Sequence, residues 1–231
     1  MKGSFQNLCK KYSHAIWFSY ALLYLPWFIY LEKNVTDYHV VHMDIDDKIP
    51  FLSVFVIPYF LWFLYVAAVV IYEFFVSVPE FKRNCTFLFT GMTIFLIVST
   101  IYPNGHHLRP VIYTDNSIFT QWVKALYETD TATNLFPSIH VYNSIGTHMA
   151  VRHSKTLKKH KGIQAVSFVL MLSICMSTVF LKQHSMFDVI TAIILCCVMY
   201  PLVYKNELFA TSSQVSEEQE EQVDYRHPNQ N

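Results

Sequence analysis

His184 and Asp188 are four residues apart near the C-terminal end of the chain, so on a helix their side chains lie on one face, one turn apart. A carboxylate that accepts a hydrogen bond from one ring nitrogen leaves the other nitrogen as a nucleophile or a base. The spacing therefore predicts a reactive histidine oriented by an acid. The structural alternative is that Asp188 caps a helix and His184 lies at the level of the lipid headgroups.

A second motif is the segment 134–140, NLFPSIH, which has the composition of a helix start. Its proline suits the first helical turn, and the hydroxyl of Ser138 can accept from a free amide. Helix starts stabilise anions, so Ser138 and His140 are predicted to lie beside a phosphate pocket. An ordinary Pro-Ser helix start with an interfacial histidine is the alternative. Asp130 and Asn134 are expected to support the pocket or to serve as turn and cap residues.

A third motif is the segment 102–110, YPNGHHLRP, which contains Arg109 beside His106 and His107. A guanidinium group can bind a phosphate through two parallel hydrogen bonds. Pairing with lipid headgroups is the alternative for Arg109. The three motifs predict one pocket for phosphoryl transfer if the fold brings them together.

The elements that must position these motifs are apolar runs. Hydrophobic residues make up 53% of the 231 positions and charged residues only 15%, which argues against a water-soluble globule. A helix needs roughly 20 apolar residues to cross about 30 Å of hydrocarbon. Of the six apolar runs in the sequence, the fourth, 137–151, is the weakest because polar residues dilute it. We predict an all-α polytopic membrane protein with a six-helix catalytic domain over 1–204, a polar acidic cytoplasmic tail over 205–231, and spans at 15–31, 51–72, 86–102, 137–151, 163–181 and 186–204.

The distribution of Lys and Arg predicts the orientation, because positively charged loops resist translocation. Six spans place both termini on one side, together with twelve Lys and Arg residues against five on the other. We therefore expect a multi-pass protein of the cell membrane with cytoplasmic termini and all three motifs on the extracytoplasmic side. The twelve are Lys2, Lys10, Lys11, Lys82, Arg83, Arg152, Lys155, Lys158, Lys159, Lys161, Lys205 and Arg226, and the five are Lys33, Lys48, Arg109, Lys124 and Lys182.

Other classes of function are disfavoured. Lys plus Arg equals Asp plus Glu, 17 each, so the charge does not favour nucleic acid as a partner. The five cysteines fall in predicted spans or on the cytoplasmic side, and we expect no disulfides. The segment 32–50 contains several His and Asp residues without a compact ligand motif, so no metal or other cofactor is expected.

The chain resembles the type 2 phosphatidic acid phosphatase superfamily, integral-membrane lipid phosphatases and phosphotransferases related to vanadium haloperoxidases. The resemblance is carried by Arg109-Pro110, by the Pro-Ser-Ile-His segment 137–140, and by the segment from Ser177 through His184 to Asp188. These segments look like the three signature blocks of the superfamily, in order. The resemblance implies six helices, with the blocks facing outward and chemistry that needs no metal.

Roles follow from the resemblance residue by residue. His184 matches the nucleophile and Asp188 its orienting partner. His140 matches the general acid that protonates the leaving oxygen, and Arg109 and Ser138 match phosphate ligands. The expected intermediate is a phosphohistidine.

Two cations of the usual pattern are missing. Tyr102 stands where the first block usually has Lys, and Thr178 stands where the third block usually has Arg. We expect Lys182 and His106 or His107 to bind phosphate in their place, because each lies on the predicted outer side.

Ile139 makes the second block similar to the Pro-Ser-x-His form of the inositol phosphorylceramide and sphingomyelin synthase branch. The predicted function is a metal-independent lipid-phosphate phosphatase acting on phosphatidic acid, a polyprenyl diphosphate or a similar phosphorylated membrane lipid. A lipid phosphotransferase of that synthase type is one alternative. A non-catalytic lipid-binding or transport protein on the same fold is the other.

Overall fold

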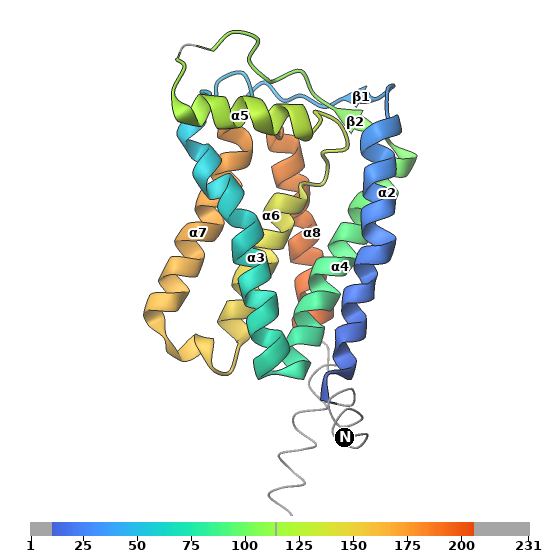
Figure 1. The fold of residues 1–231 in the computed structure, drawn as a ribbon, viewed down its shortest axis with the longest axis vertical. Helices are drawn as coiled ribbons and strands as arrows, with labels where there is room; N and C mark the ends of the chain where they lie inside the picture. The colour runs from blue at the N-terminus through green and yellow to red at the C-terminus, as the bar shows by residue number, and fades with distance from the viewer. Residues whose placement is uncertain (1–10, 114, 206–231) are drawn as a thin grey trace, which may run out of the picture.

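The computed structural model describes residues 11–113 and 115–205, so nearly all of the predicted tail over 205–231 lies outside the described residues. The described chain is predominantly helical, with one pair of very short strands (Figure 1). The elements in chain order are η1 (Ser13–Tyr20), α2 (Ala21–Asn34), β1 (His39–Val40), η2 (Ser53–Phe55), α3 (Val56–Val76), α4 (Val78–Ile101), β2 (Asn104–Gly105), α5 (Ile118–Thr129), α6 (Ile139–His153), η3 (Leu157–Lys159), α7 (Lys161–Phe180) and α8 (Met186–Tyr204).

Five helical segments among the described residues are long and apolar enough to cross a membrane. The all-α membrane-type fold is thereby confirmed. The predicted fourth span, 137–151, corresponds to α6, which has only 15 residues and is not one of the five. The five segments are Ser13–Asn34, Ser53–Val76, Val78–Ile101, Lys161–Phe180 and Met186–Tyr204.

The third of these segments begins well before its predicted start at residue 86. In α4, helical structure extends back to Val78 with a proline in the first turn, where its missing N–H costs nothing. Glu80, in that first turn, is buried and accepts a hydrogen bond from the backbone amide of Lys155 (3.0 Å). Apolar runs locate the part of a helix that suits hydrocarbon, whereas charged residues extend the same helix beyond it.

Helix α6 lies in the middle of the molecule and contacts α3, α4, α7 and α8 (Figure 1). Two glycines allow it to approach α4 closely: a Cβ atom on Gly91 would lie 2.0 Å from the ring of Tyr142, and one on Gly146 would lie 2.6 Å from the ring of Phe87. The rings of Phe87 and Tyr142 stack at 4.7 Å. This packing fixes the depth and rotation of α6, and therefore the position of the residues at its start.

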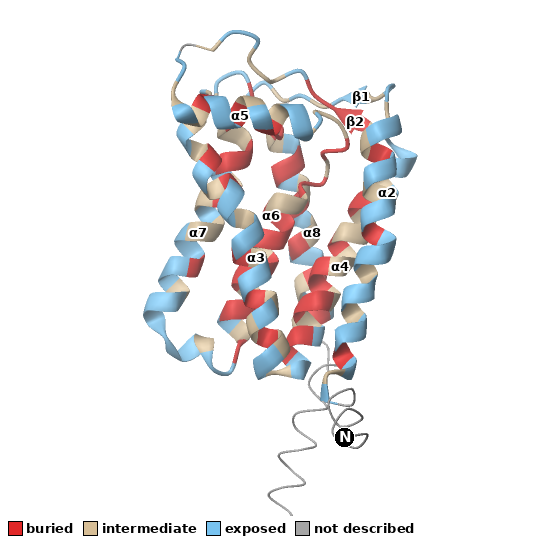
Figure 2. Ribbon diagram, in the orientation of Figure 1, coloured by how far each residue is buried: buried red, intermediate tan, exposed pale blue. Residues whose placement is uncertain are grey.

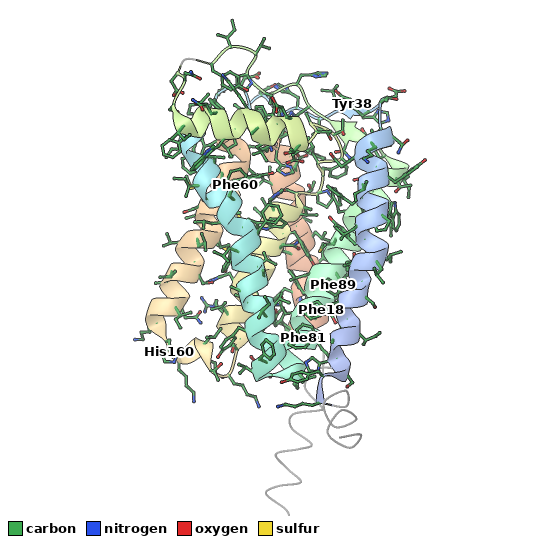
Figure 3. The ribbon with its side chains drawn as sticks, viewed as in Figure 1. Phe18, Tyr38, Phe60, Phe81, Phe89 and His160 are labelled. Carbon is green, nitrogen blue, oxygen red and sulfur yellow. The ribbon has the colours of Figure 1, made fainter. Side chains whose placement is uncertain are left out.

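The buried residues gather on the inward sides of the helices and the exposed residues on their outward sides (Figure 2). Many of the outward side chains are large and apolar, including Phe60, labelled in Figure 3, and Leu64, which is 66% exposed. A surface of this kind suits lipid rather than water.

One end of the molecule carries α5 and the two short strands. There α5 lies across the ends of the long helices, close to the parallel strands β1 and β2 (Figure 1). The predicted spans end at residue 102 and resume at 137, so no helix was expected between them. Ser117 caps α5 by accepting from the amide of Thr120, and the helix buries Thr120, Val123 and Leu126. His160, labelled in Figure 3, lies at the opposite end of the molecule.

Candidate functional site

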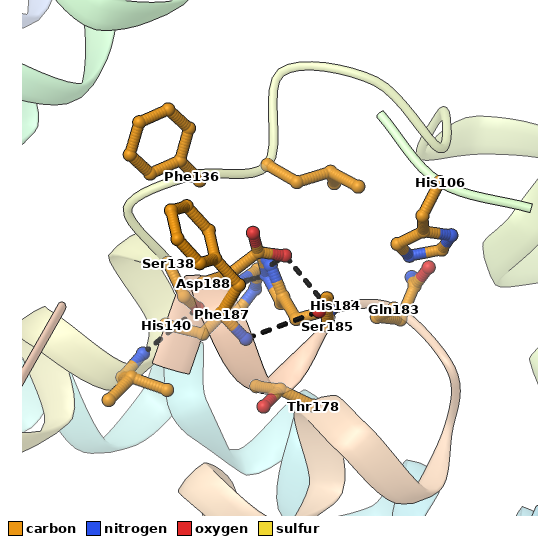
Figure 4. Close-up of polar contacts among 12 residues, drawn as sticks. His106, Phe136, Ser138, His140, Thr178, Gln183, His184, Ser185, Phe187 and Asp188 are labelled. Atoms are coloured by element: carbon orange, nitrogen blue, oxygen red, sulfur yellow. Dashed lines mark hydrogen bonds and ion pairs between the residues drawn. The ribbon is translucent and has the colours of Figure 1, made fainter. Parts of the chain in front are cut away.

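His184 lies in the turn between α7 and α8. The amides of Gln183 and His184 both donate to the carbonyl oxygen of Thr178, which folds the turn back on the end of α7. His184 donates from Nδ1 to Asp188 Oδ2 (3.2 Å), and the amide of Ser185 donates to the same oxygen (2.9 Å) (Figure 4). Asp188 therefore caps α8 and binds the imidazole at the same time, so the two interpretations of this motif are compatible.

His140 comes to this pair from the start of α6. The amide of Ser138 donates to the carbonyl oxygen of Asp188 (3.2 Å), which joins the start of α6 to the first turn of α8. Ser138 also caps α6, since its Oγ accepts from the amide of Val141. His140 Nδ1 lies 3.5 Å from His184 Nε2 (Figure 4). Two motifs that are 44 residues apart in the sequence thus place their histidines in direct contact.

The imidazole of His140 is positioned by two aromatic rings of α3. Its centroid lies 4.6 Å from the ring of Tyr59 and 4.4 Å from the ring of Trp62. Tyr59 is itself fixed, because its hydroxyl donates to Asp130 Oδ2 (3.0 Å). Neither Tyr59 nor Trp62 stands out in the sequence, because the residue spacing of α3 does not predict which side chains its aromatic rings contact.

A small cleft opens beside the two histidines; its empty space, open solvent included, is about 340 Å³. Asn134 lines it with a side chain that is only 4% exposed, and neither of its side-chain polar atoms has a hydrogen-bond partner among the described residues. Its backbone is left-handed, with φ at 56°, a conformation that asparagine tolerates better than most residues. The lining residues are Phe28, Glu32, Phe95, Asp130, Thr133, Asn134, Leu135, Ile139, His140, Gln183 and His184.

Arg109 is bound by backbone oxygens next to this cleft. Its guanidinium donates to the carbonyl oxygens of Tyr127 (3.3 Å), Asp130 (2.8 Å) and Thr131 (3.0 Å), and to the side-chain oxygen of Gln183. It also lies over the ring of Tyr127, at 4.3 Å. In this structure Arg109 organises the segment after α5, and it is not one of the residues that line the cleft. Its role as a phosphate ligand stays a prediction.

Lys182 faces the loop before η2. Its ammonium group donates to the carbonyl oxygens of Asp46 and Ile49, both at 2.6 Å. The carboxylate of Asp46, only 2% exposed, accepts from the hydroxyl of Ser185 (2.6 Å) and from the amide of Met186 (2.8 Å) at the start of α8. The structure thus places Lys182 against this loop and not in the cleft, and its predicted contact with phosphate remains untested.

The two adjacent histidines of the 102–110 segment point to different surroundings. His106 is 2% exposed and lies beside Gln183 (Figure 4), with its Nε2 atom buried and unpartnered among the described residues. His107 is exposed and contacts the ring of Tyr38 at 6.0 Å. Of the two, only His106 lies near the histidine pair.

Asn104 is a buried residue that the sequence analysis did not single out. Its side-chain oxygen accepts from the amides of Leu135 (2.8 Å) and Phe136 (3.0 Å), and its carbonyl oxygen accepts from the amide of Asn134. It thereby fixes the segment leading into α6. The dipeptide Asn104-Gly105 reads as a simple turn, so only the three-dimensional structure reveals this role.

Burial sets the protonation of the site. It lowers the pKa of His184 to about 3, assisted by the positive charge of Arg109, and it lowers the pKa of His106 to about 4. Burial and the nearby charge of Glu32 raise the pKa of Asp130 to about 6. His184 is therefore neutral near pH 7, which is the form in which an imidazole can act as a nucleophile. Among residues 11–113 and 115–205, no group of three or more His, Cys, Asp or Glu has the arrangement of a metal site.

Comparison with known proteins found one similar family. Residues 107–211 match the family model described as the PAP2 superfamily. This match confirms the similarity of the chain to the type 2 phosphatidic acid phosphatase superfamily, and it contains the histidine pair, Asp188, Ser138 and Arg109. Members of this superfamily are phosphatases or phosphotransferases. Neither a curated protein nor a solved structure matched the chain.

Proposed function

We propose that the protein is a metal-independent membrane lipid phosphatase that works through a phosphohistidine at His184. The observation that carries the proposal is the arrangement of that imidazole: Nδ1 donates to Asp188, which leaves Nε2 facing His140. His184 as nucleophile, Asp188 as the orienting acid and His140 as proton donor are then within reach of one another. We also propose that α6 is the sixth span and that the site faces the extracytoplasmic side of the cell membrane, as the charge distribution predicts.

In the proposed reaction, Nε2 of His184 attacks the phosphorus atom and forms an N–P bond. The bond from phosphorus to the lipid oxygen breaks, and His140 gives that oxygen a proton. Water then loses a proton to His140, attacks the phosphorus and releases phosphate, which restores His184. Asp188 stabilises the positive charge on the phosphorylated imidazole. Because the rings of His140 and His184 are in contact, an entering phosphoryl group has to replace that contact.

The start of α6 supports binding of the phosphoryl oxygens. The first amides of a helix have no partner within the helix; here Ser138 caps the amide of Val141, which leaves the amides of Ile139 and His140 to bind an anion, and the helix dipole adds partial positive charge. Ser138 lies at this start, and the side-chain nitrogen of Asn134 has no hydrogen-bond partner among the described residues and is free to donate.

Lipid phosphotransfer is the second candidate, because no Lys or Arg is among the described residues that line the cleft. A phosphomonoester carries up to two negative charges near pH 7, whereas a phosphodiester carries one. A cleft without a cationic side chain fits the phosphodiester better. A phosphodiester whose headgroup passes to an alcohol is the substrate of a transferase.

The test is product analysis by mass spectrometry with the purified full-length protein in detergent. It is given a panel of lipid phosphomonoesters and phosphodiesters, with and without diacylglycerol or ceramide, in the presence of a chelator. We expect product release by the wild type and at least a ~10³-fold loss for His184→Ala. His160→Ala, at the opposite end of the molecule, is the matched control and retains activity. Turnover that survives His184→Ala contradicts the phosphohistidine, and product formed only with acceptor favours the transferase.

A further inference from the structure

The cleft beside the histidine pair is lined by two carboxylates, and each has one oxygen without a hydrogen-bond partner among the described residues. Glu32 uses Oε2 to accept from the amide and the hydroxyl of Thr131, and Asp130 uses Oδ2 to accept from Tyr59 and Gln183. Within the described residues, Glu32 Oε1 and Asp130 Oδ1 accept no hydrogen bond, although both residues line the cleft.

A second and independent feature of the same cleft is Asn134. Its side-chain oxygen is buried and unpartnered, as is its side-chain nitrogen. A buried amide that makes no hydrogen bond costs free energy unless a ligand satisfies it. The cleft therefore contains three open acceptors, one each on Glu32, Asp130 and Asn134.

The charge of the cleft selects a cation for these acceptors. Burial and the electrostatic repulsion from Glu32 raise the pKa of Asp130, so Glu32 lies close enough to destabilise the charge of Asp130. The nearby cation Arg109 is already bound by carbonyl oxygens and does not line the cleft. A bound positive group would relieve the repulsion.

The rest of the lining identifies the kind of cation. The described part of the chain contains no cluster of three His, Cys, Asp or Glu suited to a metal ion. The rings of Phe28 and Phe95, 6.3 Å apart, line the same cleft and offer apolar contact to methylene groups and cation–π attraction to an ammonium group. A primary ammonium has three N–H donors, whereas a trimethylammonium group has none.

We propose that this cleft binds the primary ammonium group of a phosphodiester headgroup, with Glu32, Asp130 and Asn134 as its acceptors. The inference rests on the second candidate of the proposed function, transfer of a phosphodiester headgroup, since it places the ammonium beside the phosphorus that His184 attacks. A headgroup of the 2-aminoethyl type has the required chemistry: a short methylene chain separates its ammonium from its phosphate. Such a substrate has a single negative charge on phosphate, which agrees with the lack of cationic side chains in the cleft.

The first test is turnover of four phosphodiester lipids that share their acyl chains and carry zero, one, two or three N-methyl groups on the 2-aminoethyl headgroup. As N–H donors fall from three to none, kcat/KM should fall by about 10-fold to 100-fold, because acceptors in the cleft lose their partners. Glu32→Gln keeps an oxygen for Thr131 but removes the charge, so the ratio between the first and last lipids should shrink toward one. Glu128→Gln, an exposed carboxylate on α5, is the matched control and should keep the ratio. Equal or rising turnover along the series overturns the proposal, as does an unchanged ratio in Glu32→Gln.

The second test separates the headgroup site from the reaction. Native mass spectrometry measures binding of short-chain 2-aminoethyl and trimethylaminoethyl phosphodiester lipids to the His184→Ala variant, which lacks the proposed nucleophile. Preferential binding of the primary amine supports the site even if the wild type turns over no lipid, a result that would sink the proposed function alone. Turnover by the wild type together with equal binding of the two lipids would contradict the headgroup site but not the proposed function.

Discussion

The carboxylate of Asp188 accepts two hydrogen bonds on one oxygen, from the ring of His184 and from the amide of Ser185. Replacement by asparagine keeps an oxygen that can accept from Ser185 but removes the negative charge. We expect Asp188→Asn to lower kcat by about 10²- to 10⁴-fold. The melting temperature in detergent should change less than it does for Asp188→Ala, which also removes the cap. Asp44→Asn, an exposed carboxylate, is the control, and equal loss of activity in both variants would contradict the orienting role.

His106 provides a prediction about stability and pH. Its pKa is about 4 in the folded protein because of burial, against an ordinary value near 6.5, so the unfolded chain binds its proton first as the pH falls. The stability that its neutral form contributes is present above pH 6.5 and is lost as the pH falls from there toward 4. At pH 5 the loss is about 2 kcal/mol.

The measurement is thermal unfolding in detergent at pH 7 and pH 5. His106→Gln, which cannot take up a proton, should lose less stability between the two pH values than the wild type does. The His184 ring, whose pKa is lowered by burial as well, keeps part of the pH dependence in the variant. Identical losses in the two proteins would show that His106 titrates normally.

Residue spacing located the polar groups at the starts of helices, and the structure brings those groups together. Ser138, His140, His184 and Asp188 meet because each lies in the first turn of a helix or directly before one, where local sequence determines direction. Side chains in loops were harder to predict. Lys182 lies close to His184 in the sequence, yet tertiary contacts turn its ammonium toward the loop that contains Asp46.

At the scale of elements, the loop before η2 and the start of α8 form one unit through Asp46 and Lys182. The Lys182→Met variant loses two charge-assisted hydrogen bonds, so we expect a destabilisation of about 2–4 kcal/mol and a fall in kcat. Lys48→Met, an exposed lysine of the same loop, should have little effect. Thermal unfolding and limited proteolysis of the loop report the structural change. A raised KM for phosphorylated lipid with unchanged stability would instead support the predicted role of Lys182 in phosphate binding.

Five of the six predicted apolar runs coincide with helices long and apolar enough to cross a membrane, because lipid-facing helices are apolar on most of their surface. Helix α5 escaped notice because it is short and has only one apolar stripe. Phe119, Val123, Leu126 and Tyr127 recur at helical spacing, and Ser117 stands where a cap is expected, so the pattern was present in the sequence. The β1–β2 pairing had no such signal, since two-residue strands depend on contacts between distant loops.

At the scale of the whole molecule, the expected topology is testable by labelling. In a variant without native cysteines, Asn116→Cys precedes α5 and Lys158→Cys lies in η3; both positions are exposed and lie at opposite ends of the helices. In intact cells a membrane-impermeant thiol reagent should modify Cys at 116 and leave Cys at 158 unmodified until the membrane is opened. The reverse pattern would place the histidine pair on the cytoplasmic side.

Helix α6 has a further consequence for how the protein is made. Its 15 residues rise about 22 Å, less than the roughly 30 Å of a hydrocarbon core, and it buries Asn143, Ser144, Thr147 and His148. If such a segment moved from the insertion machinery into lipid by itself, its polar groups would face acyl chains. The transfer would therefore gain little free energy. It is covered by α3, α4, α7 and α8, and two of these are synthesised after it. We therefore expect α6 to enter the bilayer together with α7 and α8, after both have emerged from the ribosome.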